Sequence, residues 1–420
     1  MSPNHQKASA FSKYGATANQ KKILINDYCG HPFQVELSRE LALRGHDVLH
    51  VFSADDKTPK GDLIRGDADP STFMVEGVSL GKPIQKYNLL QRRRQERAYG
   101  ELICRRIDVF RPSVVIGSNN PLEAQNKIGN HCRRRSIPFI YWLQDVHSEA
   151  IKSILSQRSA IGGALIGNWY EWMEKHALRN ANHIVAIADN FIPRLESWKI
   201  SKSKVSIVEN WAPKNKIIVS PSRNAWRRTQ GLADKKVALY TGTIGFKHNP
   251  NLLLSAAEAF VSESDIQIVV VSEGKFAKQL EKEAVRRKLN NLTVLPFQPF
   301  ESYSEVLASG DVLIAMIEPD AASYSVPSKI LSYLCSGRPI VLAAERRNLA
   351  ATILDRCGGG LVVEPQDTQS FISAIRYFLC HEFERQVAGT LGRQYADKMF
   401  DVGLIAARFE SLIQQACSSQ

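Results

Sequence analysis

The chain has 420 residues, of which 44% are hydrophobic and 8% aromatic, and it carries a formal net charge of +12. Its length exceeds the roughly 100–200 residues of an ordinary domain, so two domains are the simplest interpretation, and its apolar content excludes a largely disordered chain. The seven cysteines include no Cys-x-x-Cys pair, which argues against a disulfide framework or a zinc site and favours a cytoplasmic setting.

The first half of the chain alternates predicted strands and helices. Residues 1–20 are polar and aperiodic, without the apolar core of a secretory signal or a membrane span, and are predicted to form a disordered tail. A strand at 22–26, a tight loop at 28–32 and a helix follow, and Gly45 suits the end of that helix before a strand at 47–52. Further strands are predicted at 113–117, 138–142, 183–187 and 204–208.

A polar segment interrupts this rhythm before a second series begins. Residues 213–230 contain Pro213 and Pro221 and no apolar period, which indicates a linker. Strands are then predicted at 236–240, 266–271, 292–295, 312–315 and 339–343. The last segment, 398–420, has helical apolar spacing and is expected to cross back to the first domain.

Strands rich in β-branched residues and separated by helices favour parallel sheets covered on both faces. The predicted fold is therefore α/β, with two Rossmann-like domains, residues 21–212 and 231–397, that face each other across a cleft. Ligands of such sheets bind beyond the carboxyl ends of the strands. We therefore expect ligands in the crevice between the two predicted sheets.

The positive charge is concentrated in the first domain. Residues 1–212 contain 30 Lys and Arg against 21 Asp and Glu, which leaves +9 there and +3 in the remainder. Such a surface attracts anions, so an anionic membrane, a pyrophosphate-linked acceptor and a merely solvated helix face are all open, while nucleic acid ranks last. The excess gathers in three arginine groups: Arg92, Arg93, Arg94 and Arg97; Arg105 and Arg106; and Arg133, Arg134 and Arg135.

Residues 325–339 form the most informative segment, SVPSKILSYLCSGRP. Ser325, Pro327 and Ser328 suit the first turn of a helix, because proline needs no partner for its missing N–H and serine caps free donors. Such a helix start attracts anions, and Lys329 adds a full positive charge, so a diphosphate would bind there. An ordinary capped core helix is the alternative.

A second loop supports the diphosphate interpretation. Gly242, Thr243 and Gly245 follow the first strand of the second domain, where glycines let the backbone approach a ligand, and Lys247 would neutralise phosphate opposite Lys329. Gly30 occupies the corresponding loop of the first domain. Each loop alone is a weak signal, but their shared position at strand ends strengthens it.

The sequence resembles the family 4 retaining glycosyltransferases of GT-B fold, especially bacterial members that assemble exopolysaccharide, colanic-acid-like polymers or O-antigen. The resemblance covers roughly residues 22–415. It is carried by CGHPFQVELSRELALRGHDV (29–48), WLQDVHSEA (142–150), IVENWAP (207–213), YTGTIGFKHNP (240–250), VSEG (271–274) and SVPSKILSYLCSGRPIVLAAE (325–345).

The resemblance implies a donor nucleotide held mainly by the second domain and an acceptor served by the first. The expected donor-binding residues are Gly30, Gly242, Thr243, Gly245, Glu273, Gly274, Ser325, Pro327, Ser328 and Ser332. For retention of configuration it implies a front-face displacement in which the departing diphosphate helps to take the acceptor's proton. The expected catalytic residues are Lys247 and Lys329, which stabilise developing charge, and Asp145, which orients the acceptor or the sugar. Asp145 could equally satisfy backbone donors, and no metal or other cofactor is expected.

The chain departs from the family pattern at two places. Many members carry two glutamates eight positions apart beside the donor, where this chain has Tyr324 and Ser332; Glu318 or Asp320 could substitute. Many members also have His before Asp after the corresponding strand, where this chain has Gln144 and Asp145. Contacts to the ribose and the sugar must therefore differ from the common pattern.

The predicted function is transfer of a hexosyl or deoxyhexosyl group from a UDP- or GDP-sugar to a lipid-pyrophosphate-linked or oligosaccharide acceptor. The predicted location is the cytoplasm, with peripheral attachment to the inner face of the membrane as one candidate through the basic first domain. The alternatives are a sugar-nucleotide epimerase of the same fold and a non-catalytic nucleotide-sugar-binding subunit. Fold alone does not separate the three.

Overall fold

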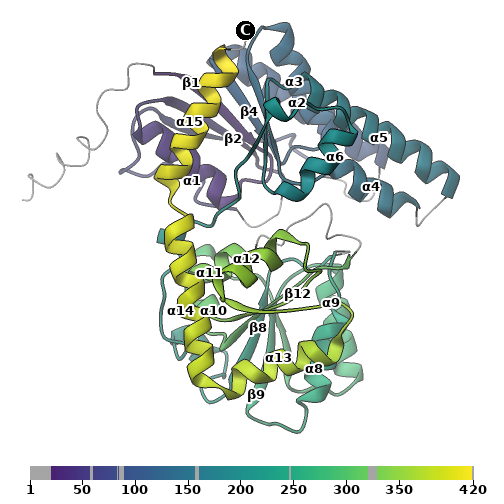
Figure 1. Cartoon of the computed structure of the whole chain (residues 1–420), viewed down its shortest axis with the longest axis vertical. Helices are drawn as coiled ribbons and strands as arrows, with labels where there is room; N and C mark the ends of the chain where they lie inside the picture. Colours follow the sequence, from purple (N-terminus) through teal and green to yellow (C-terminus); the bar gives the residue numbers. More distant parts are fainter. Residues whose placement is uncertain are drawn as a thin grey trace, which may run out of the picture. The chain divides into compact units, whose positions relative to one another are not determined.

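The computed structural model describes residues 20–56, 60–82, 84, 89–156, 160–245, 247–319 and 329–418. The chain divides into two compact units (Figure 1). Unit 1 comprises Met1–Ile187, Arg194–Val208 and Val402–Gln420, and unit 2 comprises Ala188–Pro193 and Glu209–Asp401.

Unit 1 is built on a seven-stranded parallel sheet of order β3-β2-β1-β4-β5-β6-β7. Helices lie on both faces of the sheet, as parallel pairing requires (Figure 1). The strands are β1 (Lys22–Asp27), β2 (Asp47–Ser53), β3 (Phe73–Val78), β4 (Val114–Ser118), β5 (Phe139–Leu143), β6 (His183–Ala186) and β7 (Val205–Ile207). The helices are α1 (Pro32–Leu43), α2 (Leu89–Phe110), α3 (Leu122–Arg134), α4 (His147–Ser156), α5 (Ala160–Asn180), α6 (Ile192–Ser197), which crosses the unit boundary, and α15 (Val402–Ser418).

Unit 2 repeats this design with six parallel strands in the order β10-β9-β8-β11-β12-β13. The strands are β8 (Lys236–Thr241), β9 (Ile266–Val271), β10 (Leu292–Leu295), β11 (Val312–Met316), β12 (Ile340–Ala343) and β13 (Gly360–Val363). The helices are α7 (Ala225–Thr229), α8 (Asn251–Ala259), α9 (Lys275–Arg286), α10 (Tyr303–Ala308), α11 (Lys329–Cys335), α12 (Leu349–Cys357), α13 (Thr368–Cys380) and α14 (Glu382–Met399).

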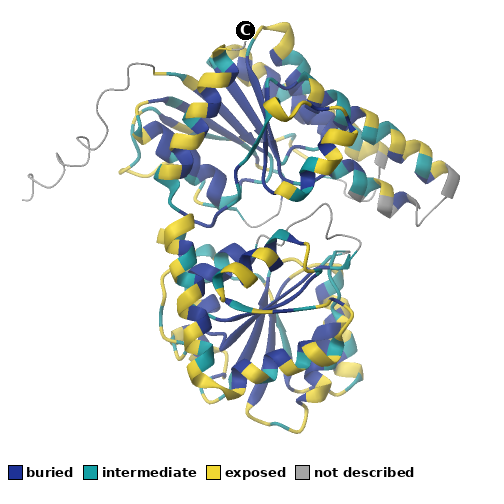
Figure 2. Ribbon diagram, viewed as in Figure 1, coloured by how far each residue is buried: buried dark blue, intermediate teal, exposed yellow. Residues whose placement is uncertain are grey.

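The cores consist of the central strands and the inner faces of the helices. In unit 2 every residue of β9 and β11 is buried, and the side chains of α8 and α13 pack on one face of this sheet. Figure 2 shows the strands largely in the buried colour and the exposed residues on the outer helix surfaces. Continuous apolar strands covered on both sides confirm the predicted α/β class with two parallel sheets.

Three segments differ from the sequence-based expectations. The edge strands β3 and β13 were not predicted, and the segment 213–230, predicted as a linker, lies within unit 2 and contains α7. Asn224 caps α7 through its side chain, which also donates to the Glu305 carbonyl (2.8 Å). The segment is therefore held against α10 by hydrogen bonds rather than running free.

The last helix, α15, belongs to unit 1 and packs on α1. Its Glu410 carboxylate accepts hydrogen bonds from the Arg44 guanidinium (2.9 Å) and lies 3.1 Å from His46 Nε2. Cys417 Sγ lies 3.8 Å from the Ser113 carbonyl, just before β4. The end of the chain thus completes the unit in which the chain begins.

Candidate functional site

The carboxyl end of β8 is the point in unit 2 where the strand order reverses. Strand β8 pairs with β9 as far as Thr241, but its pairing with β11 stops at Leu239. Beyond that residue the Tyr333 hydroxyl, from α11, accepts a hydrogen bond from Thr241 N–H (2.9 Å) and donates to the Thr241 carbonyl (3.1 Å). Helix α11 is therefore fixed against the place where such folds bind ligands.

Lys329, the first residue of α11, directs its ammonium group onto Tyr240. Its Nζ lies 2.5 Å from the Tyr240 hydroxyl and 3.7 Å from the centre of that ring, and the hydroxyl in turn donates to the Thr243 carbonyl (3.0 Å). Burial lowers the pKa of Lys329 to about 7, because a charged amine is disfavoured away from water. A nearby anion would reverse that shift, so the site is suited to a phosphate.

Gly242 lies directly beside this amine. A Cβ atom at this position would stand 3.3 Å from Lys329 Cε and 3.4 Å from Nζ, and the φ of +125° also favours glycine. The loop that follows is closed by Gly245 N–H, which donates to His248 Nδ1 (3.0 Å). The predicted residues Gly242 and Lys329 thus come together, with Thr243 in the same turn.

Both predicted lysines affect the pKa of His248. Burial, together with the charges of Lys329 and Lys247, lowers its pKa to about 3. The two lysines therefore lie within electrostatic range of one imidazole, which stays neutral and accepts the Gly245 hydrogen bond. The carbonyl of Lys247 also accepts from Glu318 N–H (2.8 Å), which ties this loop to the chain beyond β11.

The remaining predicted residues of unit 2 lie at neighbouring positions. Glu273 and Gly274 follow β9, and the Glu273 carboxylate accepts from Phe297 N–H beyond β10 (3.0 Å). Ser332, one turn after Lys329, is hydrogen-bonded to the Tyr303 hydroxyl. Ser325, Pro327 and Ser328, and likewise Tyr324 and Asp320, lie outside the described residues.

In unit 1 the predicted Gly30 is buried rather than open to a ligand. A Cβ there would meet Leu63 Cδ1 at 2.7 Å, and its φ is +72°. Packing and backbone conformation are sufficient reasons for glycine at this position. Its contact with a donor stays a prediction.

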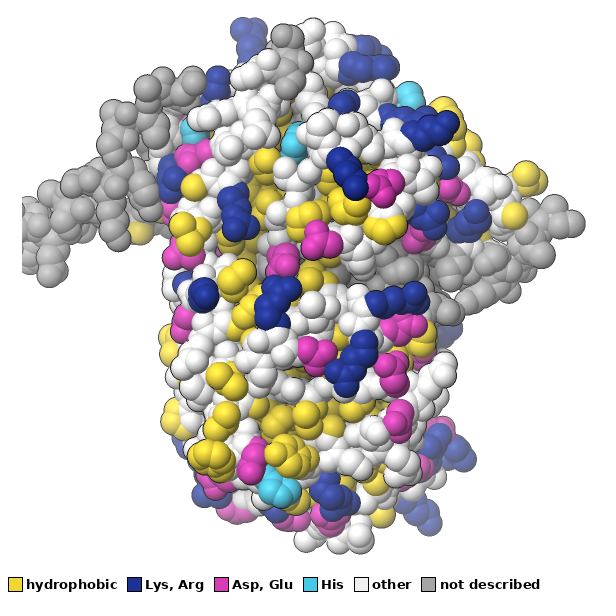
Figure 3. All heavy atoms as spheres, in the orientation of Figure 1, with side chains coloured by type: hydrophobic (Ala, Val, Ile, Leu, Met, Phe, Trp, Pro, Cys, Tyr) yellow, Lys and Arg dark blue, Asp and Glu magenta, His cyan; other side chains and the backbone are white. Residues whose placement is uncertain are grey.

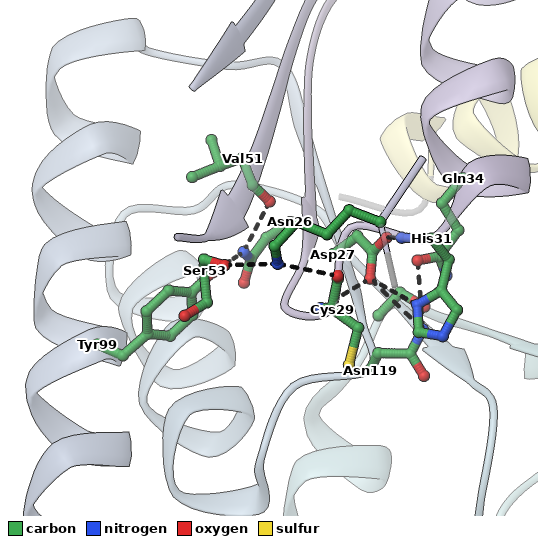
Figure 4. A network of polar contacts seen from close by, with 11 residues as sticks. Asn26, Asp27, Cys29, His31, Gln34, Val51, Ser53, Tyr99 and Asn119 are labelled. Carbon is green, nitrogen blue, oxygen red and sulfur yellow. Dashed lines mark hydrogen bonds and ion pairs between the residues drawn. The ribbon is translucent and has the colours of Figure 1, made fainter. Parts of the chain in front are cut away.

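Two ionisable residues at this end of unit 1 contact each other: Asp27, which ends β1, and His31, which precedes α1. Asp27 is fully buried and accepts backbone hydrogen bonds from Cys29 (3.2 Å) and His31 (2.5 Å), and His31 Nδ1 lies 3.5 Å from its carboxylate (Figure 4). Asn119, from the end of β4, points toward both residues. Burial raises the pKa of Asp27, but the hydrogen bond and charge of His31 outweigh it and keep the carboxyl ionised.

Asp145 follows β5 and lies near the same residues. Its negative charge helps to raise the pKa of His31 and that of Glu174, which is raised to about 7, mainly by burial. Glu174, from α5, caps the start of α4 by accepting from His147 N–H (3.0 Å) and Ser148 N–H (2.9 Å). The predicted Asp145 therefore lies within electrostatic range of both His31 and Glu174.

Sequence reasoning missed several residues of both loops. Asp27 ends the first strand, and His31 lies within the quoted loop, but neither was singled out. Tyr240, His248 and Tyr333 were treated as parts of motifs and not as hydrogen-bonding groups. A polar residue at a strand end was the available signal for Asp27, whereas nothing in the spacing pairs Tyr333 with Thr241.

Within the described part of the chain, no cluster of three or more His, Cys, Asp or Glu residues has the arrangement of a metal site. Asp67 and Asp69 lie two residues apart, a spacing that is by itself a weak cation signal, and Asp69 is paired with Arg39 (3.0 Å). Among the described helices, none has both the length and the apolar composition needed to cross a bilayer.

Comparisons with known proteins identify the family and the fold of the chain. The family model described as "Glycosyl transferase 4-like domain" matches residues 31–211, and the one described as "Glycosyl transferases group 1" matches residues 235–381. The chain belongs to the family 4 glycosyltransferases. The two matches fall on the two Rossmann-like sheets, and the fold is GT-B.

Relatives of this glycosyltransferase include WcaI of Escherichia coli strain K12, assigned to colanic acid biosynthesis as a glycosyl transferase. It is 25% identical over 240 residues, which are 56% of this chain, and the chain spans 58% of the length of that relative. Among solved structures, Anabaena HepE in complex with UDP-glucose has a TM-score of 0.66 and sucrose-phosphate synthase from Thermosynechococcus elongatus one of 0.73. Each is 16% identical, and each alignment covers 96% of this chain and 100% of the other, which shows a shared fold.

The low pKa of Lys329 predicts a stability effect with a definite sign. Between about pH 7 and pH 10.5 the unfolded chain holds a proton that the folded chain lacks, so the contribution of this group to stability rises with pH over that window. Lys329→Met removes the buried charge and should raise the free energy of unfolding near pH 7 by about 1 kcal/mol or more. The gain should shrink toward pH 10.

Denaturant titration at pH 7 and pH 9.5 measures this difference, with Lys282→Met, an exposed lysine of α9, as the matched control. A Lys329→Met variant that is less stable than the unmodified protein at both pH values would show that the amine stabilises the unliganded fold.

Proposed function

We propose that this glycosyltransferase moves a hexosyl or deoxyhexosyl group from a UDP- or GDP-sugar to a lipid-linked or growing glycan in cell-surface polysaccharide biosynthesis. The proposal rests on the contact between Lys329 and the turn at Gly242. This contact places an amine with a pKa of about 7 where the strand order of unit 2 reverses. Glycan assembly is supported by the similarity to WcaI.

The proposed role of Lys329 is to stabilise the departing diphosphate. An amine with a pKa near 7 gains a proton readily when a dianion approaches, and a partly buried charge interacts strongly because water screens it less. Lys247 adds a second positive charge within range of the same imidazole. Two lysines could carry the charge of the leaving group, so the proposed reaction requires no metal.

The proposed stereochemical outcome is retention. In a front-face displacement the bond from the anomeric carbon to the diphosphate breaks as the acceptor oxygen attacks from the same side, and the departing diphosphate helps to take the acceptor's proton. Asp145 would orient the acceptor or the sugar from unit 1. Its position after β5, beside His31, supports a role at the reacting end of the ligand.

The donor is tested by incubating the full chain with a panel of UDP- and GDP-sugars and a lipid-linked acceptor, and by following release of nucleoside diphosphate and formation of product. Lys329→Met should lower kcat/KM by about 10²–10³-fold, the usual loss when one electrostatic group of a catalytic site is removed. Lys282→Met should leave kcat/KM unchanged.

Release of no nucleoside diphosphate from any donor would count against the proposal, and full activity in Lys329→Met would remove the phosphate role. Conversion of the donor without any acceptor would instead favour an epimerase. The anomeric configuration of the product, read by NMR spectroscopy, tests retention separately.

Peripheral attachment to an anionic membrane is a further part of the proposal, through the basic and apolar surface of α2 and α5. Three apolar side chains of α5 are exposed: Leu165 (69%), Ile166 (42%) and Trp172 (58%). Arg93 lies over the Trp169 ring at 4.0 Å and brings α2 beside them. Exposed aromatic and aliphatic groups next to arginines suit a phospholipid interface.

Part of the arginine charge is already neutralised. Arg97 pairs with Glu123 (2.7 Å) and Arg92 with Glu96 (2.7 Å), and on the face shown in Figure 3 basic and acidic side chains are interspersed. Apolar contacts must therefore contribute to attachment. In sedimentation with vesicles containing phosphatidylglycerol, a double variant Leu165→Ser, Trp172→Ser should lose most of its binding.

Phe383→Ser, which removes an equally exposed apolar side chain from unit 2 (74%), is the control and should bind vesicles as the unmodified protein does. Equal binding by the double variant would place the membrane contact elsewhere.

A further inference from the structure

Helix α14 of unit 2 carries an apolar stripe along its outer side. The stripe consists of Phe383, Val387 and Leu391, whose exposed fractions are 74%, 41% and 39%. Residues four apart lie on the same side of a helix, so the three side chains are continuous. The opposite side of the helix is buried, because a Cβ atom at Gly389 would collide with the Gly337 carbonyl where α14 packs on α11.

The apolar surface continues toward the preceding helix. Tyr377, near the end of α13, is 39% exposed, and its ring lies 4.7 Å from that of His381, which directly precedes α14. Figure 3 shows hydrophobic side chains gathered where α13 and α14 meet. Single exposed apolar residues are ordinary on a protein surface, whereas a contiguous patch indicates an interaction site.

The charged side chains of α14 indicate what covers this stripe. The helix has six of them, and four are paired within it, Glu382 with Arg385 (3.9 Å) and Arg393 with Asp397 (3.0 Å). Glu384 and Lys398 remain, and neither forms an ion pair with any residue that the structure describes. The helix therefore offers one acid near its start and one base near its end to a partner.

The positions of these two charges suit a second copy of the same helix. Glu384 and Lys398 lie seven residues before and seven residues after Leu391. Seven residues are close to two turns, so the acid, the leucine and the base lie along one line of the helix. In an antiparallel pair with a two-fold axis at Leu391, each Glu384 faces Lys398 of the other copy, and the two Leu391 side chains meet at the axis.

An anionic membrane fits this surface less well. Helix α14 contains three acidic and three basic residues, so its net charge is zero. Helices that lie on membranes carry an excess of Lys and Arg on their polar side, which α14 does not have. A symmetric protein partner needs both signs of charge, and α14 supplies both.

We propose that the chain forms a two-fold symmetric homodimer through α14, with Leu391 at the axis and Glu384 paired with Lys398 of the second copy. All of these residues belong to unit 2, and the inference does not depend on the glycosyl transfer proposed above. One helix pair is a small interface beside the roughly 1,600 Å² of a standard complex, so the dimer should dissociate on dilution.

Sedimentation velocity of the full chain over a range of concentrations tests the dimer. The unmodified protein should pass from the 47.0 kDa monomer toward twice that mass as the concentration rises. Val387→Arg places a charge within the apolar stripe and should raise the dissociation constant at least about tenfold. Val285→Arg, the same change at an exposed position of α9 (74%), is the control and should leave the dissociation constant unchanged.

Exchange of the two charges tests the antiparallel arrangement. Glu384→Lys and Lys398→Glu should each weaken the dimer, because like charges then face each other twice across the axis. An equimolar mixture of the two single variants should form a heterodimer, since every contact again joins an acid and a base. The double variant should dimerise for the same reason. Glu281→Lys, an equal charge change on the exposed side of α9, is the matched control.

Three results would overturn the inference. The first is an unmodified chain that stays monomeric at every concentration. The second is dimerisation that neither Val387→Arg nor the single charge variants weaken, or a mixture of those charge variants that forms no heterodimer although both unfold at the normal temperature. The third is loss of binding to phosphatidylglycerol vesicles in Val387→Arg without any change in mass, which would assign the stripe to a membrane.

Discussion

The proposed function depends on one interaction, the contact of the Lys329 amine with Tyr240 at the carboxyl end of β8. A lysine held away from water costs stability unless an anion compensates it. The surrounding structure is organised to keep it there, because Tyr333 joins α11 to Thr241 and Gly242 leaves room for the amine. Such a cost is the usual mark of a residue retained for binding or catalysis.

The two sheets have equivalent strand orders, but the ionisable side chains at the ends of their central strands have opposite charges. In unit 2 the end of β8 is contacted by Lys329 of α11, an amine with a lowered pKa, and in unit 1 β1 ends at Asp27, a buried carboxylate whose pKa is also lowered. The first arrangement suits an anion. In the second, the carboxylate already accepts hydrogen bonds from the N–H groups of Cys29 and His31. The fold supplies equivalent positions, and the residues at the strand ends decide the chemistry.

The two parallel sheets could be predicted from the sequence because their central strands, such as residues 266–271, are continuous runs of apolar, β-branched residues. These runs are buried on both faces and are easily recognised. It was insufficient for β3 and β13, because edge strands are half exposed: β3 includes Glu76 and Gly77, and β13 has only four residues. The polar composition of residues 213–230 suggested a linker, whereas Asn224 and its neighbours hydrogen-bond into unit 2. Side-chain hydrogen bonds of this kind leave no periodic signal.

For the site, the spacing of glycines and lysines was enough to bring Gly242 and Lys329 to one place. It could not reveal that Tyr240 receives the amine, or that Gly30 is buried under Leu63, because both depend on packing between distant segments. Asp27 and His31 were overlooked for a related reason. A strand-end carboxylate and a loop histidine are common separately, and only the fold shows that Asn119 and Gln34 surround the pair.

The most direct measurement is proton uptake when UDP or GDP binds, obtained by titration calorimetry at pH 8 to 9 in buffers of different ionisation enthalpy. In this range the free diphosphate is fully ionised and Lys329 is largely neutral. The account predicts that binding draws a proton from the buffer onto Lys329, and that Lys329→Met abolishes the uptake. Binding without proton uptake, or the same uptake in that variant, would contradict it.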